Sequence, residues 1–532
     1  MKSFLFFTFF LAFYSADSLA TTYYVSASGS DNSGDGSAQN PWASLRKACS
    51  SVNTPGDIIS IGAGTYIENQ RCELAPGVSI AGQDRSNTHI QLNYYNTSVH
   101  EGAIFAVSSQ EGTQGNQQIS NIWFDVKDSC FIGILIRARS NVSVHDCKFT
   151  NFYGSAVSFD GKLEKAGLPP QPYSVNNSFY NNICINSSDR KKGGAGVIQM
   201  SGQSSMLIHD NAFDQTGRPQ GHNGNVIAAV NGFNKAIKYY DNVSTKPLDE
   251  GNTNNFTIEE WYDQGGWEIY GNTFNGGGNA IDIAYGGGNR GEYDYSFYIH
   301  DNTFTAPSQI PTYPTGRGSI ASMGIQFETE NSADAGYAII TNNHFKNLAT
   351  AVQVTMTHGD TEGFSNLCIQ KNLCENMGYA DGSYGGFIIN LTLTAGVAID
   401  SIFVDNNTLL SGTSGHARAA LYLNATAGTI RNVFFRNNII KNIVGYGYLT
   451  FDGTSVIENV ISSNNISFNN DNDNGAFTRK SPAIKNFSET QIIKSDPRLN
   501  KDFSLPPNSP GMKAGLKIGR MKEGASSNIG AY

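Results

Sequence analysis

The amino-acid sequence predicts an all-β fold, a β-helix, in which the chain winds into stacked coils of short parallel strands. Three observations support this prediction. A short motif recurs about every 30 residues, the segments beside it alternate between apolar and polar residues, and the repeat units lack helical spacing. The 532 residues include 57 Gly and only 15% charged side chains, which is typical of neither a disordered chain nor a coiled coil.

The first twenty residues predict export. Lys2 precedes a dense apolar run, and small residues at Ser18 and Ala20 fit a signal-peptidase site after Ala20. The run is too short to span a bilayer comfortably, and no later stretch is apolar enough to cross a membrane. We therefore expect residues 1–20 to be removed and the protein to be secreted, to the periplasm or the extracellular space, with no membrane partner.

The repeat motif is an apolar run, an Asn, one spacer and another apolar residue, as in "YIHDNTFT" (298–305) and "IITNNHFK" (339–346). The steps between its Asn residues are 61, 30, 41, 29, 35, 31 and 27, and the first step is two units or one unit with a large insertion. These residues are Asn211, Asn272, Asn302, Asn343, Asn372, Asn407, Asn438 and Asn465.

Coils of a β-helix stack about 4.8 Å apart, so a residue at a fixed place in each coil forms a ladder. Asn tolerates a bent turn, and its amide bonds the Asn above and below. We expect these Asn to stack in one corner over roughly ten coils. The apolar residues two positions later, Phe213, Phe274, Phe304 and Phe345, are expected to stack inside.

The N-terminal part resembles the opening of secreted, pectate-lyase-like right-handed parallel β-helix proteins. The residues that carry this resemblance are "TYYVSASGSDNSGDGSAQNPWASLRKA" (22–48), then "GDIISIGAGTYIE" and "GVSIAGQD", and the ending "SDPRLNKDFSLPPNSPGMKAG" with "SNIGAY". The resemblance implies a right-handed coil and a capping helix in "PWASLRKACSSV" (41–52), with Trp42, Leu45, Ala48 and Val52 on one side. It implies no particular reaction, since lyases, glycosidases, epimerases and non-enzymes share this fold.

The resulting division of the chain has four parts. Residues 1–20 are the signal peptide, and residues 21–110 form the N-terminal strand, capping helix and first coils. Residues 111–480 form the coils, with long loops at 234–266, 286–296 and 305–319, and residues 481–532 form a closing segment. Disulfides are allowed in an exported protein, and among the seven cysteines Cys368 with Cys374 is the first candidate pair and Cys49 with Cys72 the second. One cysteine must be left over, and the sequence does not determine the pairing. The absence of a CxxC or Cys/His cluster with metal spacing argues against a zinc site.

Candidate catalytic residues follow from strand parity. In "NAIDIAY" (279–285) Ile281 and Ile283 face the core, so Asp282 faces outward. In "GIQFETE" (324–330) Phe327 faces the core, so Glu328 faces outward on what we expect to be the next coil. The two side chains then lie about 8 Å apart, inside the window of roughly 6.5–9.5 Å for inverting glycosidases.

Candidate substrate-binding residues surround these carboxylates. Gln326, Gln353 and Tyr422 face outward on the same row, and the loops add Trp261, Tyr262, Arg290 and Tyr293. If Asp282 and Glu328 prove dispensable, the acids Glu259, Glu260 and Asp263 of the loop 234–266 are the next candidates.

The leading prediction is a secreted glycoside hydrolase that uses Asp282 and Glu328 on a polysaccharide or oligosaccharide, without a cofactor or metal. The alternative is a polysaccharide lyase that cleaves a uronic-acid glycan by β-elimination, for which a Tyr or a cation is needed and calcium could bind the acidic loops. A third class is a non-catalytic glycan binder or adhesin. The net charge of −9 and the lack of a basic stripe argue against nucleic acid, and mildly against a strongly anionic glycan unless a local basic pocket overrides the total charge. We expect a monomer.

Overall fold

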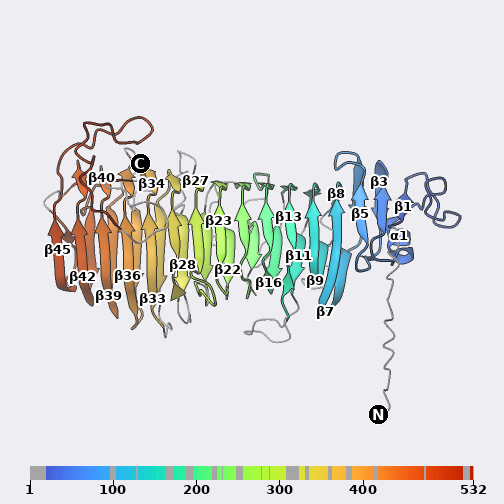
Figure 1. The fold of residues 1–532 in the computed structure, drawn as a ribbon, viewed down its shortest axis with the longest axis horizontal. Coiled ribbons are helices and arrows are strands. Elements are labelled where there is room, and N and C mark those ends of the chain that lie inside the picture. Colours follow the sequence, from blue (N-terminus) through green and yellow to red (C-terminus); the bar gives the residue numbers. More distant parts are fainter. Residues whose placement is uncertain are drawn as a thin grey trace, which may run out of the picture.

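The computed structural model describes the chain from residue 20 onward, except residues 96–102, 128–129, 153, 162–171, 187–195, 218–224, 230–231, 247–255, 277, 285, 287, 307–322, 330–334, 358–361, 379–385, 413–416, 472–474, 519–527 and 531–532. The described residues form a long solenoid of parallel strands, with coils stacked in chain order from β1 to β45 (Figure 1). The predicted right-handed parallel β-helix is confirmed. None of the described helices is long and apolar enough to cross a membrane.

The strands form three rows along the axis, and every strand pairing within them is parallel. Row 1, which carries the candidate site, comprises β4 (Cys72–Glu73), β7 (Ala103–Ser120), β9 (Ile132–His145), β11 (Ser155–Asp160), β15 (Ile198–Ser201), β19 (Ile227–Ala229), β22 (Phe256–Trp261), β25 (Asn279–Ala284), β28 (Met323–Thr329), β32 (Thr350–Met356), β35 (Phe387–Leu393), β38 (Ala419–Ala425), β41 (Leu449–Gly453) and β44 (Phe477–Thr478).

Row 2 follows row 1 along the chain in most coils. It comprises β1 (Thr22–Val25), β2 (Ile58–Ile61), β5 (Ser79–Gly82), the later parts of β7 and β9, β13 (Ser178–Tyr180), β17 (Leu207–His209), β20 (Lys238–Tyr240), β23 (Trp267–Tyr270), β26 (Phe297–His300), β30 (Ile339–Thr341), β33 (Phe364–Gln370), β36 (Ala398–Asp405), β39 (Thr429–Arg436), β42 (Val456–Ser463) and β45 (Ala483–Thr490). The short strand β29 (Ala335–Gly336) also pairs with β33.

Row 3 is a separate 14-stranded sheet. It comprises β3 (Gly64–Glu68), β6 (Thr88–Leu92), β8 (Trp123–Asp125), β10 (Lys148–Thr150), β14 (Ile183–Ile185), β18 (Ala212–Asp214), β21 (Val243–Thr245), β24 (Thr273–Asn275), β27 (Thr303–Thr305), β31 (His344–Lys346), β34 (Leu373–Met377), β37 (Thr408–Ser411), β40 (Ile439–Lys441) and β43 (Ile466–Phe468). The coils are therefore more numerous than the predicted ten, because the N-terminal coils lack the Asn motif. A further pair, β12 (Ser174–Val175) with β16 (Gln203–Ser204), lies outside these rows.

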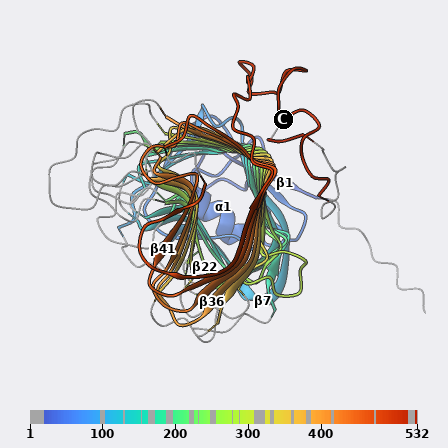
Figure 2. The same ribbon diagram turned by 90° about the vertical axis from the view of Figure 1, so that its left-hand side faces the viewer.

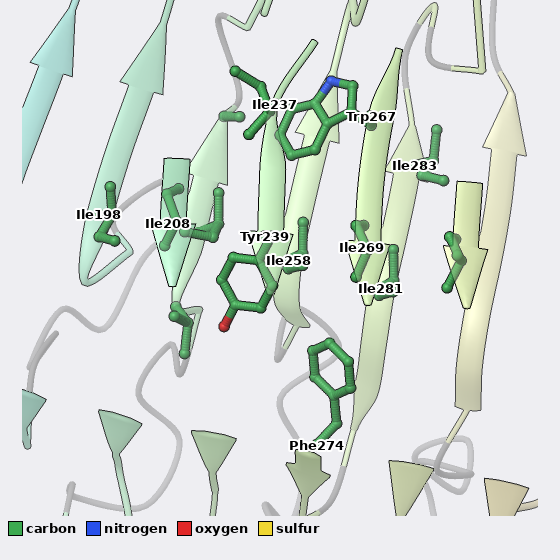
Figure 3. Close-up of a cluster of buried hydrophobic side chains, with 14 of the residues drawn as sticks. Ile198, Ile208, Ile237, Tyr239, Ile258, Trp267, Ile269, Phe274, Ile281 and Ile283 are labelled. Carbon is green, nitrogen blue, oxygen red and sulfur yellow. The ribbon is translucent and has the colours of Figure 1, made fainter. Parts of the chain in front are cut away.

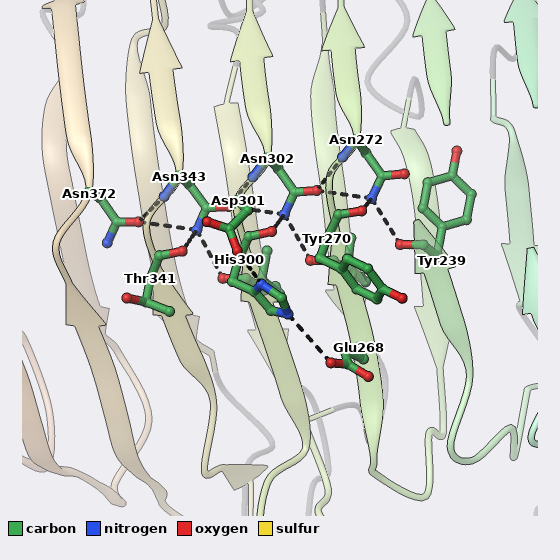
Figure 4. A network of polar contacts seen from close by, with 12 residues as sticks. Tyr239, Glu268, Tyr270, Asn272, His300, Asp301, Asn302, Thr341, Asn343 and Asn372 are labelled. Carbon is green, nitrogen blue, oxygen red and sulfur yellow. Dashed lines mark hydrogen bonds and ion pairs between the residues drawn. The ribbon is translucent and has the colours of Figure 1, made fainter. Parts of the chain in front are cut away.

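The Asn ladder is confirmed and longer than predicted (Figure 4). Asn302 donates its backbone N–H and its side-chain amide to Asn343 Oδ1, at 3.0 Å each, and its amide also reaches the carbonyl oxygen of Ile269 at 2.8 Å. Equivalent bonds join Asn182, Asn211, Asn242, Asn272, Asn302, Asn343, Asn372, Asn407, Asn438 and Asn465. The bent position is one residue earlier than expected: Asp301 (φ 56) and Asn342 (φ 55) adopt left-handed backbone, whereas the ladder Asn do not.

The prediction that the segment 234–266 leaves the repeat is wrong. Asn242 belongs to the ladder, and the described part of the segment contains β20, β21 and β22. Its motif, "KYYDNVST", was missed because Ser244 stands where the neighbouring coils carry Phe213 and Phe274. Tyr239 fills that space, since its hydroxyl lies 3.3 Å from Ser244 Oγ and its ring stacks on Phe274 at 6.3 Å (Figure 3). The interior Phe stack is otherwise as predicted: Phe274, Phe304 and Phe345 are spaced 4.7 Å apart.

The helix α1 (Leu45–Ser51) is shorter than the predicted 41–52. Ser44 has an extended backbone and accepts a hydrogen bond from the Lys47 N–H at 3.1 Å, so it is the N-cap and the helix starts after it. The predicted face is buried, with Leu45 and Ala48 in the main core. In a view along the axis α1 lies inside the outline of the coils (Figure 2), and its role as a cap remains a prediction.

The C-terminal part and the cysteines differ from expectation. The coils continue into the segment 481–532, because β45 pairs with β42 as a further coil. The described residues after it pack through Ile493, Leu499 and Ile529 on row 3. All seven cysteines are free, so the predicted disulfides are wrong. Cys374 is buried in the core on β34 and Cys368 lies on β33 outside it, so the two point to different sides of the coil wall.

Candidate active site

Row 1 carries two columns of outward side chains, each formed by residues in register on successive coils. The outer column comprises Glu259, Asp282, Gln326, Gln353, Asn390, Tyr422, Thr450 and Phe477. The second column, two residues further along each strand, comprises Trp261, Ala284, Glu328, Thr355, Thr392, Asn424 and Asp452.

The predicted parity is confirmed. Ile281 and Ile283 lie in the hydrophobic core (Figure 3), so the pleat turns Asp282 to the other side of the sheet. Gln326 is the register partner of Asp282, and Glu328 stands opposite Ala284. The offset of one coil and two residues, about 8 Å, is therefore the one that parity predicted.

A third carboxyl group completes the cluster. Glu259 on β22 is the direct register partner of Asp282. Sequence reasoning placed it in a loop, although the alternation in "FTIEEW" (256–261) continues the row and was a usable signal. Glu259, Asp282 and Glu328 thus occupy three successive coils of the same face.

Burial distinguishes these carboxyls from ordinary surface acids. Asp282 is 2% exposed and its Oδ1 lacks a hydrogen-bond partner. Burial, reinforced by the charges of Glu328 and Glu259, raises the pKa of Asp282 well above its usual range. Burial likewise raises the pKa of Glu259 to about 7, although hydrogen bonds from Asn225 and Trp261 partly favour its charged form. Burial thus favours the protonated form of Asp282, which is the form that can donate a proton.

Neutral amides hold the neighbouring carboxylates. Asn225 donates to Glu259 Oε2 at 2.6 Å, and Gln326 donates to Glu328 Oε2 at 3.0 Å. Asn279 in turn donates to Gln326 Oε1 at 3.0 Å. Glu328 is half-buried, so of the three it is the one with access to solvent. The arrangement pairs a buried acid with a more accessible carboxyl on the next coil.

Two further buried acids follow Glu259 on the same coil. Glu260 and Asp263 are both fully buried, and each has one oxygen without a partner. Burial raises the pKa of Glu260 well above its usual value, with the charge of Asp263 adding to the effect. Burial also raises the pKa of Asp263 to about 8, while its Oδ1 accepts a hydrogen bond from the Gly288 N–H at 2.7 Å. Glu260 faces the core rather than the outward columns, because it is in register with Ile283.

The predicted substrate-binding residues divide into two groups. Gln326, Gln353, Tyr422 and Trp261 belong to the two outward columns. Tyr262, Arg290 and Tyr293 lie at corners beyond them: Tyr262 stacks on Phe233 at 5.2 Å and the Arg290 guanidinium lies 4.1 Å from the Tyr337 ring. Tyr293 lies beside Gly266. Most of the predicted loop 305–319 falls outside the described residues.

The columns also contain residues that sequence reasoning missed. Asn390 donates to Gln353 Oε1 and Thr392 donates to Asn390 Oδ1, both at 3.0 Å. Tyr422 donates to Asp452 Oδ2, and Arg479 donates to the same oxygen at 3.0 Å. Alternation in "FIINLTL" (387–393) marks Asn390, but no local pattern marks the distant Arg479 as a partner of Asp452.

In the part of the chain that the structure describes, no group of three His, Cys, Asp or Glu side chains is arranged to hold a metal ion.

Comparisons with known proteins find similarity to solved structures but none to a family model or a curated sequence. The Agl-KA catalytic domain is a similar solved structure (TM-score 0.42, 12% identity), in which the match covers 84% of this chain and 64% of that one. The catalytic domain of a GH87 α-1,3-glucanase with nigerose (TM-score 0.41, 15% identity) is matched over 90% of this chain and 68% of that one. An alginate lyase from Paenibacillus sp. str. FPU-7 (TM-score 0.29, 14% identity) is matched over 67% of this chain and 91% of that one.

The glucanase and the alginate lyase are enzymes of different reaction types, and the likeness of this chain to them is one of fold alone. The parallel β-helix that the N-terminal sequence predicted is supported by the strand pairings of rows 1 to 3.

Proposed function

We propose that the protein is a secreted glycoside hydrolase that cleaves a polysaccharide or oligosaccharide lying along row 1. The observation that carries this proposal is the outward pair Asp282 and Glu328 on adjacent coils, in which the burial of Asp282 favours its protonated form. Hydrolysis of a glycosidic bond requires one carboxyl as acid and a second as base or nucleophile.

In the proposed mechanism Asp282 donates its proton to the leaving oxygen as the bond to the anomeric carbon breaks. Glu328 removes a proton from a water molecule, whose oxygen attacks the anomeric carbon from the opposite face. The separation of about 8 Å leaves room for that water and supports inversion of configuration. Gln326, Gln353 and Asn390 offer neutral amides that suit sugar hydroxyls, and a charged Glu259 helps to keep Asp282 protonated.

A lyase is the second candidate, and one observation favours it. Tyr422 and Arg479 place a phenol and a cation on the same face, which are the groups that β-elimination from a uronate needs. However, burial and the hydrogen bond to Asp452 raise the pKa of Tyr422, so its phenol is a poor base. The hydrolase is therefore the better supported of the two.

The first experiment is product analysis on a panel of neutral and uronic polysaccharides. We expect new reducing ends with inverted anomeric configuration by proton NMR. An unsaturated uronate product, with loss of activity on calcium chelation, would instead establish the lyase, and binding without any product would indicate the non-catalytic binder.

The matched variants are Asp282→Asn and Glu328→Gln. Each is expected to lower turnover at least about a hundredfold, the usual scale for a lost acid or base. Asp282→Asn should leave the melting temperature nearly unchanged, because it replaces a neutral carboxyl by a neutral amide of the same size. Glu458→Gln is the control, since Glu458 is half-buried on row 2 away from the columns. Full activity in both test variants would remove these residues from catalysis.

A further inference from the structure

Four aromatic side chains gather at the C-terminal end of the outward columns. Phe387 and Tyr422 stack with ring centroids 3.8 Å apart, and Tyr446 and Phe477 stack at 5.8 Å. The two pairs meet where Phe387 and Tyr446 lie 6.3 Å apart. We call these four residues the aromatic cluster. Because Tyr422 and Phe477 belong to the outer column, the cluster lies on the same face as Asp282.

Three of the four rings in the aromatic cluster are partly exposed, whereas Tyr422 is buried. Phe387, Tyr446 and Phe477 are half-buried, in contrast to the fully buried interior stack of Phe304 and Phe345. Half-exposed rings gathered on one face mark a place where an apolar surface can be covered by a partner. Their position at one end of a polar column indicates that the partner also contacts that column.

Charged groups border the rings. The Arg479 guanidinium lies 5.2 Å from the Tyr446 ring and its side chain is 45% exposed, while the Arg418 guanidinium lies 5.9 Å from the same ring. Asp452 is buried beneath them and binds both Tyr422 and Arg479. Burial alone would raise the pKa of Asp452, but these hydrogen bonds and the Arg479 charge lower it, so Asp452 is an ionised anchor that orients Arg479.

We propose that the aromatic cluster is a distal subsite that binds a pyranose ring of the glycan chain whose cleavage occurs at Asp282. Apolar ring faces of a sugar stack on aromatic side chains, and the guanidinium N–H groups donate to the sugar oxygens. This inference rests on the proposed function, because it identifies which part of the substrate the far end of the site binds.

The geometry sets a length requirement. Gln326, Gln353 and Asn390 separate Asp282 from Tyr422, which makes four coil steps, or about 19 Å along the axis. A glycan that occupies both ends must run parallel to the coil axis and span that distance. A short oligosaccharide seated at Asp282 does not reach the aromatic cluster, so affinity should rise with chain length.

The test measures calorimetric binding of oligosaccharides from disaccharide to octasaccharide, one series of neutral β-gluco-oligosaccharides and one of oligogalacturonates. The full chain with Asp282→Asn is used so that no turnover occurs. In at least one series we expect the octasaccharide to bind at least about tenfold more tightly than the disaccharide. Tyr446→Ala and Arg479→Gln, each added to Asp282→Asn, should abolish that difference and leave disaccharide binding unchanged.

Row 2 offers matched controls. Phe434 stacks on Phe403 at 5.1 Å and has the Arg436 guanidinium 5.0 Å from its ring, so Phe434→Ala removes an equivalent ring from another face. Arg431 is 44% exposed and paired with Asp400, so Arg431→Gln matches Arg479→Gln. Melting temperatures establish that all four variants fold.

Equal affinity for long and short ligands, or equal losses in the row 2 controls, would overturn the distal subsite. These outcomes are distinguishable from failure of the proposed function. Length-dependent binding without hydrolysis by the wild-type chain would support the distal subsite and reject the hydrolase. Hydrolysis by the wild-type chain without length-dependent binding would support the hydrolase and reject the distal subsite.

Discussion

Asp282 owes its position and its chemistry to different causes. Its direction follows from the two isoleucines beside it, which the pleat sends into the core. Its raised pKa depends on burial and on Glu259 and Glu328, which come from the preceding and following coils. The first cause is local in sequence and the second is not.

Glu259→Gln tests this dependence. Removing the negative charge of Glu259 should lower the pKa of Asp282, because a neighbouring anion disfavours ionisation of the acid. Asp282 then loses its proton at lower pH, so the alkaline limb of the pH–rate profile should move to lower pH while the peak rate falls less than in Asp282→Asn. An unshifted limb would show that the Glu259 charge does not act on the acid.

The Asn ladder is the element that keeps successive coils in register. Asn343 donates to Asn372 Oδ1, to the Ile299 carbonyl oxygen and to the Thr341 carbonyl oxygen, all within 3.1 Å. Because this corner of the coil is buried, water cannot replace the hydrogen bonds that Asn343 makes to its neighbours. The Phe stack beside it contributes through packing rather than through hydrogen bonds.

Two alanine substitutions separate these contributions. Phe345→Ala should lower the free energy of unfolding by about 3–5 kcal/mol, since it leaves a cavity between Phe304 and Cys374. Asn343→Ala should cost about 1–3 kcal/mol, because it leaves buried amide groups of the ladder unpaired. Urea denaturation of both variants provides the measurement. Negligible losses in both would contradict the inward placement of these residues.

At the scale of the whole molecule, the buried acids couple folding to pH. Burial raises the pKa of Asp263 from its ordinary value of 3.8 to about 8. Between these values the folded protein binds a proton that the unfolded chain has lost, so stability falls as pH rises and levels off above the folded pKa. The slope is about 1.4 kcal/mol per pH unit for each such group.

Asp263→Asn should flatten this dependence. We expect the wild-type melting temperature to fall from pH 5 to pH 8, and the variant to fall less, because its amide stays neutral in both states and can still accept the Gly288 N–H. Thermal unfolding across this pH range provides the measurement, with Glu458→Gln as a control. Parallel curves for variant and wild type would show that Asp263 is ionised in the folded protein.

The sequence by itself determined the architecture, because the signals that encode it are local and repeated. Alternation places Ile281, Ile283 and Phe327 inside, and the Asn spacing near 30 residues establishes the stacking of coils. The same rules predicted that Asp282 and Glu328 lie one coil apart, which the strand register confirms. They failed at Ser244, where a small residue replaced the expected Phe and hid one coil.

Only the tertiary structure decided which acids differ from surface carboxylates and which residues join them. Three features arise from contacts between neighbouring coils: the burial of Asp282, the approach of Glu259, and the pairing of Asp452 with Arg479. No periodic pattern in the sequence distinguishes these side chains. Parity fixes only the face of the sheet on which a side chain lies. Its solvation, proton affinity and partners depend on the packing of neighbouring coils, a non-local quantity that forms only once the solenoid has folded.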